Sequence, residues 1–195
     1  MRKISNVALF ISLIFSTASV SSAQNKLESW YTYWGVGWAN VSYPNEFNDS
    51  HDLFKGLPGV RHISVSVDLF GFYWPSGEKT VLGVIVNSWG DFYTLGSDHV
   101  QINGFLLSFS LMHFLNHRIG QGFFVRGDFG TSQLEIRSST YFGGTSDRGF
   151  GGLIGGGYGF PISKGTRILL NMNYSFRFIE GDKYGCLAIT VGGLF

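Results

Sequence analysis

Polar and apolar residues alternate along most of the chain, and the alternation is clearest near its end. From Arg167 onward, the even positions between Ile168 and Phe178 are apolar, whereas the odd positions are mostly polar. Successive side chains of a β-strand point to opposite faces, so this pattern predicts a strand with one apolar and one polar face. A short turn at 180–183 precedes a second alternating run at 184–195, which predicts an antiparallel hairpin.

Six further segments with strand-like patterns precede this hairpin. They lie at residues 29–41, 61–74, 80–93, 101–115, 122–136 and 149–161. The connections after the second, fourth and sixth segments are short and rich in turn residues, whereas 42–60 and 137–148 are longer and polar. Eight strands with longer loops at one end predict an all-β fold, an eight-stranded antiparallel up-and-down transmembrane β-barrel.

Strict alternation in the segment 61–74 predicts one uninterrupted apolar face. The residues on that face are Ile63, Val65, Val67, Leu69 and Tyr73. The same reading places Phe70 and Phe72 on the polar face with Asp68, because they share its parity.

Composition supports a chain in contact with lipid. It contains 28 Gly, 17% aromatic residues and 14% charged residues, whereas soluble domains carry roughly 25% charged residues. No apolar run beyond the N-terminus reaches the ~18 residues that a spanning helix needs, which leaves a closed barrel as the spanning structure. The single cysteine, Cys186, excludes an intramolecular disulfide.

Residues 1–23 have the pattern of a secretory signal peptide. Arg2 and Lys3 precede an apolar centre, and Ser21 and Ala23 provide the small residues that predict cleavage after Ala23. The predicted mature domain is 24–195. The whole chain has a formal net charge of +1, and removal of the leader with Arg2 and Lys3 leaves the mature domain at −1. No basic patch suggests a nucleic-acid partner.

The polar face of the predicted strands consists mainly of small residues, as a narrow enclosed interior requires. They are Ser64, Ser66, Ser108, Ser110, Gly130, Ser132 and Ser175. Aromatic residues lie toward the strand ends of the apolar face, as in the girdles of membrane barrels. The sequence therefore favours apolar residues outside and polar residues inside. A soluble lipocalin-like barrel, with the faces exchanged, is the alternative.

The leader, the eight strands and the terminal run 187–195 together resemble the small outer-membrane barrels of Gram-negative bacteria, the OmpA and OmpX type. The resemblance implies location in the cell outer membrane, contact with outer-membrane lipids and insertion by the barrel-assembly machinery. In that family a terminal Phe and alternating apolar residues form the assembly signal, which matches Leu187, Ile189, Val191 and Phe195. Gly193 departs from the pattern, where a bulky residue is common.

Charged residues on the enclosed face predict an interior ion-pair network. Its members are Asp68, Arg126, Asp128 and Arg177, with Asp91 as a further candidate. An eight-stranded barrel is just wide enough for side chains to fill, and buried charges are costly unless paired. We expect a polar plug; a narrow gated conduction path is the alternative.

No catalytic residue, metal site or cofactor is predicted. His62 and Ser64 have the His-x-Ser spacing of outer-membrane lipid A deacylases, but both point inward and no third acid is evident. No metal-ligand spacing of His or Cys is present. The loop 42–60 groups acidic residues near His51, which indicates a solvated loop, with divalent-cation binding as the alternative.

These patterns predict a non-enzymatic integral outer-membrane β-barrel with a structural or surface-interaction role. Its extracellular loops, 42–60 and 137–148, would carry any binding to an extracellular ligand, whose identity the sequence does not indicate. A small gated channel or carrier of apolar solutes is the second hypothesis. A lipid A-modifying enzyme is the third.

Overall fold

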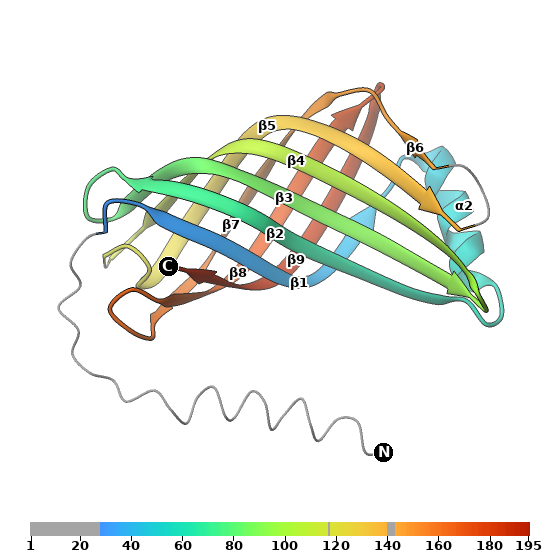
Figure 1. Ribbon diagram of the computed structural model, residues 1–195. Helices are drawn as coiled ribbons and strands as arrows, with labels where there is room; N and C mark the ends of the chain where they lie inside the picture. The colour runs from blue at the N-terminus through green and yellow to red at the C-terminus, as the bar shows by residue number, and fades with distance from the viewer. Residues whose placement is uncertain (1–27, 117, 140–142) are drawn as a thin grey trace, which may run out of the picture.

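Eight long antiparallel strands form a closed barrel in the computed structural model, which describes residues 28–116, 118–139 and 143–195 (Figure 1). The strands are β1 (Tyr31–Ser42), β2 (Arg61–Pro75), β3 (Thr80–Leu95), β4 (Asp98–Phe114), β5 (Gly122–Ser138), β7 (Gly149–Pro161), β8 (Arg167–Ile179) and β9 (Asp182–Leu194). The predicted fold class is confirmed. The predicted signal peptide and its cleavage site lie outside the described residues.

The barrel closes by pairing of its first and last strands. The β1–β9 register runs from Tyr33 opposite Leu194 to Ser42 opposite Gly185. The other long strands pair with their neighbours along the chain, and the two-residue strand β6 (Gly144–Thr145) pairs only with the end of β5. Closure leaves no long strand edge unpaired.

The two ends of the barrel differ in their connections. The start of β1 and the C-terminus lie at one end, here called the terminal end, together with the connections β2–β3, β4–β5 and β7–β8 (Figure 1). The opposite end carries the two long connections, after β1 and β5, and two tight turns, β3–β4 and β8–β9. Helix α2 (Asn45–Gly56) lies at the opposite end, here called the helix end. The Pro44 carbonyl accepts hydrogen bonds from the amides of Phe47 and Asn48, which begins the helix. The strand pattern did not predict α2. In the described part of the chain, no helix is long and apolar enough to cross a membrane.

A β-bulge interrupts β2 and corrects the predicted faces of that strand. The pairing of β2 with β3 shifts between Asp68 and Phe70. Tyr73 is fully buried and hydrogen-bonds Ser110 at 2.8 Å, whereas the Phe70 side chain is 56% exposed. Because the extra residue turns the rest of the strand over, the prediction that Tyr73 faces outward and that Phe70 and Phe72 face inward was wrong.

Elsewhere the two faces lie as the alternation predicted. Large apolar side chains on the outer face are well exposed, such as Phe109 at 78% and Ile154 at 64%, and they form an apolar belt around the barrel. The small serines of the opposite face are buried, apart from the partly buried Ser64. Beyond the belt, Gln101 and Glu135 make the outer surface of β4 and β5 polar near the helix end.

The interior is filled in three layers. An apolar cluster occupies the terminal end and includes Tyr33, Tyr73, Phe114, Phe124 and Leu169. Charged and amide side chains fill the middle. A second apolar cluster, with Trp89, Leu134 and Tyr184, lies toward the helix end. The expectation of a polar plug therefore holds only for the middle layer, because aromatic rings close the terminal end.

Candidate functional site

Arg126 binds two carboxylates in the middle of the barrel. Its guanidinium donates to Asp128, with Nη2 2.6 Å from Oδ2, and to Asp68, with Nη1 3.0 Å from Oδ2. Ser110 donates to Asp128 at 2.5 Å, and Asn87 donates to Asp68 at 3.1 Å. All three charged groups are buried, so these contacts replace the water that each has lost.

Arg177 belongs to a different group, which corrects its predicted place in the ion-pair network. Its guanidinium donates to Asn87 at 2.9 Å and to Ser175 at 3.0 Å, and it lies over the Trp89 ring at 5.5 Å. Among the described residues, no carboxylate forms an ion pair with Arg177. Asn87 links the two groups, because its amide oxygen accepts from Arg177 while its nitrogen donates to Asp68.

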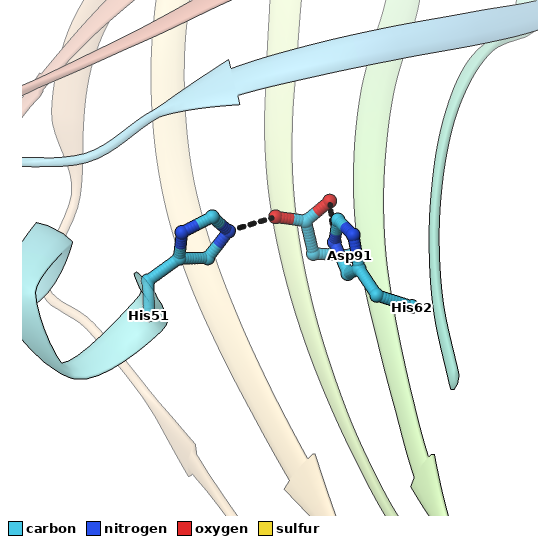
Figure 2. A group of neighbouring side chains, drawn as sticks. All are labelled: His51, His62 and Asp91. Carbon is cyan, nitrogen blue, oxygen red and sulfur yellow. Dashed lines mark ion pairs between the residues drawn. The ribbon is translucent and has the colours of Figure 1, made fainter. Parts of the chain in front are cut away.

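A second polar group forms at the helix end, from residues of three elements: His51 of α2, His62 of β2 and Asp91 of β3 (Figure 2). His51 Nε2 lies 3.6 Å from Asp91 Oδ2, and His62 Nε2 lies 3.3 Å from Asp91 Oδ1. Figure 2 shows the two imidazoles approaching the two oxygens of the carboxylate from different sides. Here this group is called the mouth triad.

Strand register and aromatic packing position the mouth triad. Ser64 pairs with Asp91, and His62 pairs with Tyr93, so all four residues face the interior. The His62 ring stacks on Tyr93 with centroids 4.6 Å apart. His51 reaches the same place from α2 and packs against Tyr43 at 4.9 Å between ring centroids.

Hydroxyl groups hold the Asp91 carboxylate in place. Tyr43 donates to Oδ2 at 2.7 Å, and Ser64 donates to Oδ1. Burial, and secondly the nearby Asp91 charge, raises the pKa of Tyr43 far above its usual value, so that its phenol remains a donor. His51 Nε2 is buried and has no hydrogen-bond partner, although it points at Asp91.

Ser64, His62 and Asp91 do not have the geometry of a hydrolytic triad. The sequence predicted no acid near His62 and Ser64, yet the structure places Asp91 beside both. However, Ser64 Oγ and Asp91 Oδ1 both approach the same nitrogen, His62 Nε2, at 3.2 and 3.3 Å. In a Ser-His-Asp triad the serine and the acid use different ring nitrogens, so this arrangement does not orient a general base.

An apolar pocket of about 200 Å³ lies beside the mouth triad. Its walls come from the segment 43–51 and from β3, β4 and β5: Tyr43, Phe47, His51, Tyr93, Val100, Ile102 and Ile136. Its lining surface is entirely apolar, although His51 contributes to it. The pocket can therefore hold a small apolar molecule next to a polar group.

The predicted assembly-signal residues lie along the end of β9. Ile189, Val191 and Phe195 are exposed on the outer face, Leu187 is partly exposed, and Phe195 stacks on Trp34 with centroids 6.1 Å apart. Their role in assembly stays a prediction.

Comparison with known proteins identifies the fold. No protein-family model and no curated protein matches the sequence. The crystal structure of Neisserial surface protein A (NspA) matches with a TM-score of 0.51 and 10% identity, covering 85% of this chain and 96% of that chain. Ail, the attachment invasion locus protein of Yersinia pestis, matches with a TM-score of 0.49 and 11% identity, covering 87% and 100%. At these identities the likeness concerns the fold alone, and by fold the chain is similar to the small eight-stranded outer-membrane barrels.

Removing the cation between the two buried carboxylates should strongly destabilise the barrel. We expect Arg126→Met to lower the free energy of unfolding by about 3–5 kcal/mol, because Asp68 and Asp128 would remain buried without their cationic partner. Urea unfolding in detergent micelles, followed by tryptophan fluorescence, measures the change.

Arg118→Met is the matched control. Arg118 lies 3.9 Å from Glu78 in an exposed ion pair, whose loss should cost at most about 1 kcal/mol. Equal effects of the two substitutions would contradict a stabilising role for the buried group.

Proposed function

We propose that the protein is a non-enzymatic barrel of the cell outer membrane that binds at its outer end and does not conduct. In this proposal the terminal end faces the periplasm and the helix end faces the outside. The apolar belt, the leader pattern and the two long connections at the helix end, after β1 and β5, support this placement. The proposed partners are outer-membrane lipids, the barrel-assembly machinery and an extracellular ligand.

The filled interior is the observation that carries the proposal. Aromatic and aliphatic side chains close the terminal end, and Arg126 links carboxylates of β2 and β5 across the middle. A conduction path would require these buried contacts to break. Binding at the helix end needs no such opening, because α2 lies in the connection between β1 and β2, outside the strands that form the barrel wall.

Two features argue against the enzyme hypothesis. Ser64 faces the interior, away from lipid substrates, and the mouth triad does not orient His62 as a base. The apolar pocket instead favours a second candidate function, which is the binding of a small apolar solute at the outer end. Its volume of about 200 Å³ exceeds the roughly 150 Å³ of an engineered cavity that binds benzene.

Surface labelling tests the placement of the two ends. Cys186 is buried, so a cysteine introduced at an exposed position should be the main reactive thiol. We expect Leu53→Cys in α2, where the native side chain is 70% exposed, to react with a membrane-impermeant maleimide on intact cells. Ser76→Cys, in the turn at the terminal end, should react only after the cells are broken. The opposite result would reverse the orientation.

Planar bilayer recordings test the closed interior. We expect no steady conductance from the wild-type protein. Arg177→Ala should destabilise the barrel, because it removes a side chain that holds Asn87 and Ser175, and it should not open a large channel. Large conductance from the wild type would contradict the proposal, whereas steady conductance from the variant alone would favour a gated path.

Binding of a fluorescent naphthylamine probe tests the pocket. We expect saturable binding to the wild-type barrel and at least tenfold weaker binding to Ile102→Trp, because the larger ring fills the pocket. Leu107→Trp is the matched control on the same strand, since Leu107 is exposed on the outer face. Equal binding to both variants would place the probe in the micelle or on the apolar belt and would remove the second candidate function.

A further inference from the structure

The mouth triad has the dimensions of a metal site. One donor atom from each of His51, His62 and Asp91 can be chosen so that all three lie within 4.8 Å of one another. The His51–Asp91 and His62–Asp91 separations are 3.6 and 3.3 Å. These two separations run to different oxygens of the Asp91 carboxylate. Ligand atoms bound at about 2.0–2.1 Å around a tetrahedral ion lie about 3.3 Å apart, so the three donors would draw together from within 4.8 Å to bind one ion.

The donor set indicates the kind of ion. Two imidazole nitrogens and one carboxylate oxygen suit divalent zinc, copper or nickel, whereas calcium and magnesium prefer sites built of oxygen atoms. Three protein ligands also leave one position of a tetrahedral ion open.

The buried nitrogen of His51 gives independent support. His51 is only 8% exposed, yet its Nε2 atom has no hydrogen-bond partner and points at Asp91 (Figure 2). Leaving a buried polar atom unpaired destabilises the folded protein, and a bound cation would give this nitrogen a partner. A direct hydrogen bond is not made at 3.6 Å.

Neighbouring groups orient the donors as they do around bound metals. His51 Nδ1 lies 3.3 Å from Asp52 Oδ1, which favours a proton on Nδ1 and leaves the Nε2 lone pair free toward Asp91. The hydroxyls of Tyr43 and Ser64 donate to the two oxygens of Asp91 and hold the carboxylate. These contacts fix the donors before any ion arrives.

We propose that His51, His62 and Asp91 bind one divalent transition-metal ion at the helix end of the barrel. The ion joins α2 to β2 and β3, because each element supplies one ligand. Its binding therefore orders the segment that forms the outer end. The site does not depend on whether the barrel conducts or whether the pocket holds a solute.

Calorimetric titration of the full-length, chelator-treated barrel with Zn²⁺ tests the proposal. We expect one ion per chain and at least tenfold weaker binding for His51→Ala and for His62→Gln. His113→Ala is the matched control, because His113 contacts Thr80 near the terminal end, and it should bind as the wild type does. No binding to the wild type, or equal affinity in all four proteins, would overturn the proposal.

Two further measurements keep the test decisive if a variant folds poorly. Co²⁺ bound to the wild type should show the intense visible absorption of a tetrahedral nitrogen–oxygen site. Zn²⁺, and not Mg²⁺, should slow hydrogen exchange in α2 at least tenfold. Octahedral Co²⁺ spectra together with unchanged exchange would show that the wild-type protein lacks the proposed site.

Discussion

Closure of the strand ring is the constraint on which the rest of the structure depends. Pairing of β1 with β9 satisfies the backbone of every long strand within the wall. A ring of eight strands encloses little more than its own side chains, so whatever faces inward must be packed or paired. The bonds of Arg126 to Asp68 and Asp128 are a direct result of this confinement.

The packed interior and the proposed binding sites lie in different parts of the barrel. Apolar clusters lie on both sides of the charged middle layer, so the centre of the barrel serves stability. An apolar pocket lies instead at the helix end, beside the mouth triad, where the buried His51 Nε2 also lacks a hydrogen-bond partner. The proposed functions therefore use that end, where one helix and three strands supply the lining.

Sequence alternation predicted the strands and most inward-facing residues, including Arg126 and Asp68, because a strand has a two-residue period. It could not predict the bulge in β2. Counting from the turn at 75–79 along an unbroken ladder pairs Ser64 with Phe92, whereas the bulge pairs it with Asp91. His51 carried no periodic signal, since α2 lies within a loop that appeared only polar. The role of Asn87 as the partner of Arg177 also depended on cross-strand register.

The bulge near Leu69 has a consequence for how this protein tolerates change. In β2, the odd-numbered Tyr73 faces the apolar layer, whereas the even-numbered Asp68, Ser64 and His62 face the polar groups. The additional residue of the bulge allows even-numbered positions before it and odd-numbered positions after it to face the interior. Loss of a single codon there would direct Ile63 and Val65 into the lumen and would turn Ser64 and Asp68 onto the outer face. Length at this position is therefore under tighter constraint than side-chain identity, since Leu69 itself only faces outward.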